Sequence, residues 1–477
     1  MRHIPLALTY DDVLILPKRS TLISRSEAIT KTRLTKRVNL NIPIVSSNMD
    51  TVSESEMAIA MARLGGISII HRFMTIEENI EEIRRVKRAQ NFIVSDPYTI
   101  DATKTVGEAK KFIAANGVSG LLVTTGDRRL RGILSKRDFI FVKDDNQFVE
   151  QVMTPREKLI VGGRNTNFAE AKEKMMMYKI EKLPLVDEND VVIGLITADD
   201  IKNLTEYPLA NIDSSGRLIV CGSVGLHGDY LERAQELVRA GADVLVVDIA
   251  HGHSEMMFKA LKNLREKCGG VQIIAGNIAT ADGARELCEA GVDAVKVGVG
   301  PGTICITRLV TGCGVPQLTA VMEAAEMAKK YGVPVIADGG IQKSGDIVKA
   351  LGAGADTVML GGLLAGTKES PGVIMSRGDK KYKVCRGSAS FAVAQRRQAV
   401  QQENKNLSEV VPEGVESVVP YKGPVADLVG QLVGGLKSGM SYTNSHTIAE
   451  LQNNADFVQI TTAGSRESGA HDLMEVK

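Results

Sequence analysis

The chain has 477 residues, enough for one large domain and a smaller one. Its net charge of +1, its lack of tryptophan and its aromatic content of 4% argue against a nucleic-acid partner. The six cysteines show no zinc-site spacing, no apolar run is long enough to span a membrane, and the N-terminus lacks a secretory pattern. We therefore expect a cytoplasmic protein that binds neither nucleic acid nor membrane.

Short apolar runs alternate with amphipathic helical stretches through most of the chain. Their successive β-branched and apolar residues are typical of parallel strands covered on both faces. Helices such as 230–240 and 282–290 are predicted between them. The expected strands are 43–47, 67–71, 218–222, 244–248, 271–275, 293–297, 333–337 and 356–360. Eight strands with helical crossovers predict an α/β fold, a (β/α)₈ TIM barrel.

A long insertion separates the second predicted strand from the third. Within it, Gly132–Asp138 and Gly194–Asp200 share the pattern glycine, two apolar residues, Ser or Thr, two further residues and Asp. A repeated β-β-α unit placed in a barrel loop accounts for this pattern. The sequence therefore predicts a catalytic barrel formed by residues 1–90 and 206–477, with the repeat in residues 91–205.

Each repeat carries a hydroxyl residue three positions before an aspartate. The pairs are Ser135 with Asp138 and Thr197 with Asp200. Such a pair caps a helix N-terminus, and it could equally hold the ribose and phosphate of a nucleotide. The sequence alone leaves both interpretations open, although duplication of the whole unit favours the nucleotide.

Cys305 ends a glycine-rich loop that follows the predicted strand 293–297. Gly298, Gly300 and Gly302 would let backbone N–H groups approach an anion, and Thr303 adds a hydroxyl. A thiol on such a loop at a strand's carboxyl end is placed to attack a substrate. The alternative is a free, partly buried cysteine without a chemical role.

Glycine pairs follow the last two predicted strands, where TIM barrels often hold phosphate. They are Gly339-Gly340, after Asp338, and Gly361-Gly362. The carboxylate of Asp338 could accept two ribose hydroxyls, or it could cap a helix start. Together with Cys305, this pattern predicts a nucleotide substrate and a cysteine nucleophile.

Longer segments make the chain resemble the family of IMP dehydrogenases and GMP reductases over almost its whole length. The insertion resembles a pair of CBS domains, the Bateman module. The matching segments are Tyr10–Pro17, Asn48–Glu54, Asp248–Glu255, Gly276-Asn277, Gly300–Arg308, Ala337–Ile341, Met359–Gly362, Gly366–Gly372 and Val411–Gly423. The resemblance implies an enzyme of purine nucleotide salvage in which a cysteine adds to C2 of the base while a nicotinamide exchanges hydride there.

The resemblance also implies roles for particular residues. The catalytic residues would be Cys305, Thr307 and Glu413. The substrate-binding residues would be Ser47, Thr303, Asp338, Gly339, Gly340, Gly361, Gly362, Tyr382, Gly387 and Ser388. The nicotinamide cofactor would meet Asp248, Asn277, Gly298 and Gly300, and Gly300, Gly302 and Cys305 could bind K⁺. Purine nucleotides would regulate the enzyme through Ser135, Asp138, Thr197 and Asp200, and the family implies a homotetramer or homooctamer.

The two reactions of the family differ in how the cysteine adduct is resolved. IMP dehydrogenases hydrolyse it with an Arg-Tyr pair on a flap, which should lie between Gly387 and Pro412. The flap here contains Arg396 and Arg397 but no tyrosine. A GMP reductase needs no water, because hydride from NADPH resolves the adduct and ammonia leaves. We therefore predict an NADPH-dependent GMP reductase that converts GMP to IMP.

Other features favour an IMP dehydrogenase that oxidises IMP to XMP with NAD. The Ala250–Glu255 stretch and the insertion are dehydrogenase-like, and Arg396 or Arg397 would then activate water. Asn48 is more like the reductase pattern, whereas Arg72 replaces a lysine usual in both enzymes. A catalytically inactive nucleotide sensor and a flavin-dependent barrel oxidoreductase are further alternatives.

Overall fold

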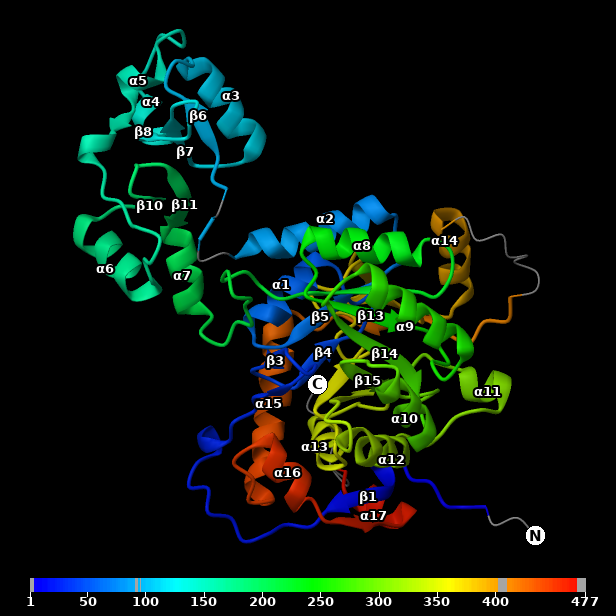
Figure 1. Ribbon diagram of the computed structural model, residues 1–477. Helices are drawn as coiled ribbons and strands as arrows, with labels where there is room; N and C mark the ends of the chain where they lie inside the picture. The colour runs from blue at the N-terminus through cyan, green and yellow to red at the C-terminus, as the bar shows by residue number, and fades with distance from the viewer. Residues whose placement is uncertain (1–3, 91–92, 95, 402–409, 470–477) are drawn as a thin grey trace. The chain divides into compact units, whose positions relative to one another are not determined.

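The computed structural model describes residues 4–90, 93, 94, 96–401 and 410–469 (Figure 1). The chain divides into two compact units. One unit comprises Met1–Ala89, Leu209–Ile212 and Leu218–Lys477, and the other comprises Gln90–Pro208 and Asp213–Arg217. Within the described ranges, no helix is long and apolar enough to cross a membrane.

The first unit contains a closed barrel of eight parallel strands in the order β12-β13-β14-β15-β16-β17-β4-β5 (Figure 1). This confirms the predicted TIM barrel. The strands are β4 (Ile44–Ser46), β5 (Ile67–Ile70), β12 (Cys221–Val224), β13 (Val244–Asp248), β14 (Gln272–Ile278), β15 (Ala294–Val297), β16 (Val335–Asp338) and β17 (Thr357–Leu360).

The third barrel strand lies further along the chain than the predicted 218–222. Leu218 forms an isolated bridge with Ile212, and β12 begins at Cys221, which pairs with Val244. Residues 218–221 are all apolar and buried, so hydropathy alone could not separate the bridge from the strand.

Strand residues alternate between two apolar clusters. On β13, Val244 and Val246 face the cluster inside the barrel, whereas Leu245 and Val247 pack with the surrounding helices. The covering helices include α1 (Ser55–Arg63), α2 (Ile76–Ala89), α8 (Tyr230–Ala240), α9 (Glu255–Lys267), α10 (Ala281–Glu289), α12 (Gln317–Lys329), α13 (Ser344–Gly352), α15 (Val425–Tyr442) and α16 (Ile448–Asn454). Burial on both faces explains the continuous apolar character of these strands.

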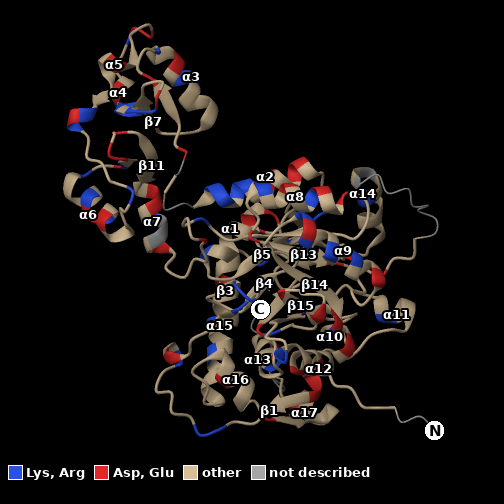
Figure 2. Ribbon diagram, in the orientation of Figure 1, with Lys and Arg blue, Asp and Glu red and all other residues tan. Residues whose placement is uncertain are grey.

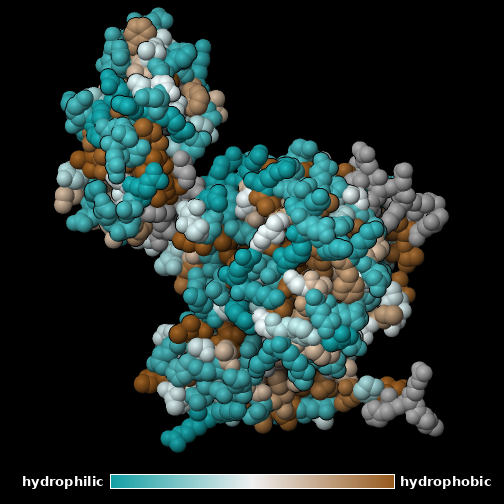
Figure 3. Space-filling view, viewed as in Figure 1, coloured by the Kyte–Doolittle hydropathy of each residue, from teal (hydrophilic) through white to brown (hydrophobic). Residues whose placement is uncertain are grey.

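Many of the helices carry both basic and acidic residues (Figure 2). Helix α2 carries Glu77 and Glu78 in its first turn and Lys87 and Arg88 in its last, an arrangement that complements the helix dipole. The surface in this view is mostly hydrophilic, with scattered apolar side chains (Figure 3). Such a distribution is ordinary for a folded domain.

A small antiparallel sheet follows the barrel strands in the same unit. It consists of β18 (Met375–Arg377), β19 (Lys380–Arg386) and β20 (Glu416–Pro420). Between β19 and β20 lies α14 (Phe391–Gln401), which contains both flap arginines. Residues 402–409 of the predicted flap lie outside the described residues.

The second unit contains the repeated motif twice. Its first copy has α3 (Val106–Asn116), β7 (Gly120–Thr124), β8 (Leu130–Ser135) and α4 (Lys136–Phe139); its second has α6 (Phe168–Tyr178), β10 (Lys182–Val186), β11 (Val192–Thr197) and α7 (Ala198–Glu206). Strands β7 and β8, like β10 and β11, pair antiparallel. This order agrees with the duplication in the sequence.

Candidate active site

The cysteine loop leaves β15 and leads into the short helix α11 (Thr307–Thr311). Gly298 has φ +150°, and a Cβ there would lie 2.0 Å from the Asp338 carbonyl oxygen, so no side chain fits. Half-buried Cys305 places its Sγ 3.1 Å from the Thr307 Oγ1, and its N–H donates to the Gly302 carbonyl at 3.0 Å. The loop thus presents a thiol and a hydroxyl side by side.

Glu413 comes to this loop from a segment more than a hundred residues later in the chain. Cys305 and Gly414 form an antiparallel bridge. The Ile306 N–H donates to the Glu413 carbonyl at 2.8 Å, and the Val415 N–H donates to the Ile304 carbonyl at 3.0 Å. The three predicted catalytic residues therefore lie on two adjacent backbone segments.

The predicted phosphate site gathers residues from the ends of several strands. A Cβ on Gly362 would lie 3.2 Å from the Thr303 Oγ1, and one on Gly361 would lie 3.7 Å from the Ser47 Cβ. Gly339 has φ +94°, and a Cβ there would lie 2.9 Å from the Pro301 ring. These half-buried glycines therefore bring backbone without side chains close together where the strands end, as a phosphate cradle requires.

A buried lysine inside β15 joins the predicted ribose and nicotinamide residues. The Lys296 Nζ lies 2.5 Å from the Asp248 Oδ1 and 2.8 Å from the Asp338 Oδ2, and it also donates to the Asn277 Oδ1. Asn277 in turn donates to the Asp338 Oδ2 at 2.9 Å. The cluster formed by Lys296, Asp248, Asn277 and Asp338 is called the lysine hub below.

Contacts within the lysine hub favour the charged forms of Asp248 and Lys296. Burial raises the pKa of Asp248, but the Lys296 ammonium and the hydrogen bonds that it and Asn48 donate outweigh burial and leave the pKa below its ordinary value. Burial likewise opposes the charge of Lys296, but Asp248 and Asp338 raise its pKa overall. Asp248 and Lys296 are therefore both ionised at neutral pH.

Sequence reasoning missed Lys296 because it was counted within the apolar run of a strand. The available signal was a lysine within a strand whose residues are buried on both faces. Because a buried lysine needs a charged partner, it indicated a nearby carboxylate. Asn48 was noted only as reductase-like. Its Nδ2 donates to the Asp248 Oδ2 at 2.9 Å, so it belongs beside the hub.

The last predicted substrate residues lie around β19. Gly387 donates its N–H to the Val415 carbonyl at 3.0 Å, and a Cβ there would lie 3.3 Å from the Ile304 carbonyl oxygen; half-buried Ser388 follows it. Tyr382 is half-buried and pairs with Met375 and Pro420.

In the described part of the chain, no hydrogen bond joins the Tyr382 hydroxyl to the glycine pair after β17. Lys422 reaches that turn instead, and sequence reasoning missed it. Its Nζ lies 3.1 Å from the Gly362 carbonyl oxygen and 2.7 Å from that of Leu363. Lys422 therefore supports the backbone of the predicted phosphate site.

Gly340 and Gly300 also adopt left-handed backbone conformations. Gly340 has φ +79°, and a Cβ there would lie 3.4 Å from the ring of Tyr10. Gly300 has φ +82°, and a Cβ there would lie 2.5 Å from the Arg308 side chain. Packing against Arg308 therefore excludes a side chain at position 300, whereas at position 340 glycine is favoured by the left-handed backbone alone, whatever ligand the two positions meet. Among the described residues, no group of three or more His, Cys, Asp or Glu side chains could hold a metal.

The hydroxyl–aspartate pairs of the second unit cap helices. The Ser135 N–H and Oγ both donate to the Asp138 Oδ2, at 2.6 and 2.7 Å, and the Thr197 N–H and Oγ1 both donate to the Asp200 Oδ2, at 2.9 and 2.6 Å. Burial raises the pKa of Asp200. The capping interpretation is thus observed, and the nucleotide interpretation stays a prediction.

Comparison with known proteins places this architecture in a family. A model described as the IMP dehydrogenase / GMP reductase domain matches residues 7–471. The chain belongs to this family of oxidoreductases.

Similar relatives carry both names. An inosine-5′-monophosphate dehydrogenase of Nitrosopumilus maritimus (strain SCM1) is 48% identical and covers 98% of each chain. A GMP reductase of Leishmania donovani is 50% identical over 99% of this chain and 98% of its own. A crystal structure of a GMP reductase variant from Trypanosoma brucei with guanosine 5′-monophosphate matches with a TM-score of 0.90 at 47% identity, over 99% of both chains. These identities do not separate the two reactions.

Proposed function

We propose that the protein is an NADPH-dependent GMP reductase that converts GMP to IMP and ammonia. The observation that carries the proposal is the flap. It has no tyrosine between Gly387 and Pro412, and the guanidinium of Arg396 forms an ion pair with Asp50 at 3.9 Å. A flap that lacks a water-activating pair is consistent with a reaction in which hydride transfer, and not hydrolysis, resolves the cysteine adduct.

The reaction begins with the thiolate of Cys305, which bonds to C2 of GMP. The neighbouring Thr307 hydroxyl and the Glu413 carboxylate carry a proton to the departing amine, and ammonia leaves to give a thioimidate. NADPH supplies the hydride that reduces C2. The C2–S bond then breaks, which releases IMP and restores the thiolate.

The surrounding residues bind and orient the two nucleotides. Gly361, Gly362 and Thr303 take the phosphate of GMP, and Asp338 accepts hydrogen bonds from the ribose. Asp248 and Asn277 face the nicotinamide. Lys296 contacts the other three residues of the lysine hub, and it therefore holds the ribose-binding and nicotinamide-binding side chains at fixed positions relative to one another.

The remaining assignments rest on the family resemblance. They are a CBS pair that binds regulatory purine nucleotides at Ser135, Asp138, Thr197 and Asp200, a tetramer or octamer, a cytoplasmic location and K⁺ at the cysteine loop. GMP reductases crystallised with guanosine 5′-monophosphate and guanosine 5′-triphosphate support nucleotide binding here.

An IMP dehydrogenase is the second candidate. It is favoured by the dehydrogenase-named relatives, which are about as similar as the reductases, and by the Ala250–Glu255 stretch. In that reaction, Arg396 or Arg397 would have to activate the water that hydrolyses the cysteine adduct.

The two candidates are separated by turnover of the purified protein with each substrate pair. We expect NADPH oxidation with GMP and no NADH formation from IMP and NAD. NADH formation from IMP would establish the dehydrogenase instead. Absence of turnover with both pairs would indicate a nucleotide sensor.

A further inference from the structure

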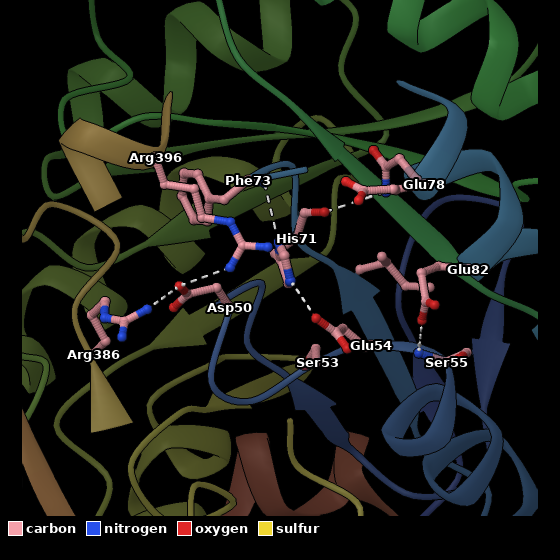
Figure 4. A network of polar contacts seen from close by, with 12 residues as sticks. Asp50, Ser53, Glu54, Ser55, His71, Phe73, Glu78, Glu82, Arg386 and Arg396 are labelled. Carbon is pink, nitrogen blue, oxygen red and sulfur yellow. Dashed lines mark hydrogen bonds and ion pairs between the residues drawn. The ribbon is translucent and has the colours of Figure 1, made fainter. Parts of the chain in front are cut away.

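Asp50 is a buried carboxylate that lies between two arginines, Arg386 and Arg396 (Figure 4). Its side chain is 1% exposed. Its Oδ2 lies 2.7 Å from the Arg386 Nη1 and 3.9 Å from the Arg396 Nη1, and its Oδ1 is buried without a hydrogen-bond partner among the described residues. A buried carboxylate of this kind depends on its cations, because removing them leaves an uncompensated charge.

The two arginines stand on either side of the segment that connects β19 to α14. Arg386 is the last residue of β19, and its N–H also donates to the Thr51 Oγ1 at 3.0 Å. Arg396 is near the middle of α14, where Val393 is fully buried. Asp50 therefore contacts the strand that precedes the flap helix through a hydrogen-bonded ion pair with Arg386, and the helix itself through a longer ion pair with Arg396, whose side chain is 45% exposed.

This segment also touches the reacting groups. Between the two arginines, Gly387 bonds to Val415, and the Ala389 carbonyl accepts the Glu413 N–H at 3.0 Å. Val415 and Glu413 in turn pair with the cysteine loop. A shift of α14 away from the barrel would therefore loosen the segment that positions Glu413.

The loop that carries Asp50 is itself anchored at its far end. The Glu54 Oε1 lies 3.1 Å from the Nε2 of fully buried His71, and the Ser55 N–H donates to the Glu82 Oε2 at 2.6 Å (Figure 4). At its near end, Asn48 contacts Asp248. The loop that carries Asp50 is therefore held by side-chain contacts at both of its ends, and Asp50 contacts α14 through Arg396.

We propose that Asp50 is a positioning residue that clamps α14 against the barrel through Arg386 and Arg396, and that this clamp excludes water from the Cys305 thioimidate. The inference rests on the proposed reductase reaction. In this proposal Arg396 belongs to the clamp, because the Arg396 guanidinium forms an ion pair with the Asp50 carboxylate.

The clamp has a chemical consequence that can be measured. If water reaches the thioimidate, its oxygen bonds to C2, the C2–S bond breaks, and XMP leaves while the thiolate is restored. Since ammonia has already departed, this leak converts GMP and water to XMP and ammonia without oxidising NADPH. With an intact clamp, the enzyme releases one ammonia for each NADPH consumed. With a loosened clamp, it releases more than one ammonia for each NADPH consumed.

The experiment measures ammonia, NADPH consumption and XMP for the wild type, Asp50→Asn and Arg396→Gln. We expect equal ammonia and NADPH in the wild type, a small excess of ammonia in Arg396→Gln and a larger excess in Asp50→Asn, each matched by XMP. Arg396→Lys, which keeps the charge, should restore most of the coupling. Arg377→Gln is the matched control, because Arg377 is exposed on β18 and forms no ion pair in the described part of the chain.

Amide hydrogen exchange of Phe391–Gln401 tests the clamp without reference to the reaction. We expect exchange to accelerate about two- to fivefold in Arg396→Gln, as for a partly exposed ion pair. In Asp50→Asn we expect about tenfold or more, because both arginines lose their buried partner. Circular dichroism shows whether each variant remains folded, and Arg396→Gln alone decides the question if Asp50→Asn unfolds.

The clamp is overturned if the folded variants exchange at the wild-type rate and keep equal ammonia and NADPH. Failure of the wild type to consume NADPH with GMP would instead contradict the proposed reaction, and the exchange measurement would still test the clamp. The two failures are therefore distinguishable.

Discussion

The lysine hub in the barrel and the two aspartate caps in the repeated unit both contain buried or half-buried carboxylates, but they are built differently. The hub joins residues from four strands, Asp248, Asn277, Lys296 and Asp338, that are far apart in sequence. In the caps, Asp138 and Asp200 bond hydroxyl residues only three positions away.

That difference separates two kinds of evidence for a site. A helix cap satisfies its own polar groups, so its geometry is complete without a ligand. Grouping four polar side chains at the strand ends of a barrel costs desolvation free energy. Such a group is expected where the side chains also contact a substrate. The hub is thus stronger structural evidence for a site than the caps are.

The largest effect is expected at the cysteine loop that the hub supports. Cys305→Ala should lower GMP turnover by about 10⁴-fold or more, because no other thiol lies on this loop within reach of the substrate. Thermal unfolding should change little, since Cys305 is only half-buried. Steady-state assays and calorimetry check both expectations, and appreciable residual turnover would exclude the covalent mechanism.

Removing the cation of the hub is the next largest change. Lys296→Met should lower the free energy of unfolding by about 3–5 kcal/mol at neutral pH, because the half-buried carboxylates of Asp248 and Asp338 lose the buried cation that they share. Denaturant unfolding measures this loss. Lys330→Met, at an exposed lysine of the same unit, is the control and should change stability by less than about 0.5 kcal/mol.

The pH dependence of the same variant sharpens the test. In the wild type, the depressed pKa of Asp248 contributes stability above the ordinary value of 3.8 and loses it as the pH falls further. Without Lys296, burial raises that pKa above its ordinary value, so the variant gains stability on acidification. The stability difference between the two proteins should therefore narrow as the pH falls from the raised pKa of the variant to the depressed pKa of the wild type, two values that lie on either side of 3.8. A constant difference would show that Lys296 does not stabilise the Asp248 charge.

A smaller effect is expected at the proton-transfer pair. Thr307→Val preserves shape but removes the hydroxyl that lies 3.1 Å from the Cys305 Sγ. Turnover should fall by about 10²-fold with little change in the KM for GMP, because the group acts on the leaving amine. Thr311→Val on the same short helix is the control. A loss confined to KM would show that Thr307 binds substrate.

The smallest effect is expected at the caps of the repeated unit. Asp138→Ala and Asp200→Ala should each lower the free energy of unfolding of that unit by about 0.5–2 kcal/mol and leave basal turnover unchanged. If the unit binds regulatory nucleotides there, their effect on activity should also disappear. Intact nucleotide regulation in both variants would restrict these residues to capping.

The same contrast explains what the sequence could predict. Local patterns located the barrel strands, with the third placed too early in the chain, and they located the duplication, the capping pairs and the cysteine loop, because each depends on neighbouring residues. Lys296, Lys422 and the pairing of Asp50 with Arg386 depend on contacts between segments distant in sequence. Asp50 and Arg386 are 336 positions apart in the sequence, so no pattern among neighbouring residues predicts their contact.

The most direct test of the central claim follows the hydride. The protein is incubated with GMP and NADPH that carries deuterium at the transferable position, and the product nucleotide is analysed by mass spectrometry. The account predicts IMP with one deuterium at C2. Formation of XMP and NADH from IMP and NAD, with no deuterated IMP from GMP, would contradict it.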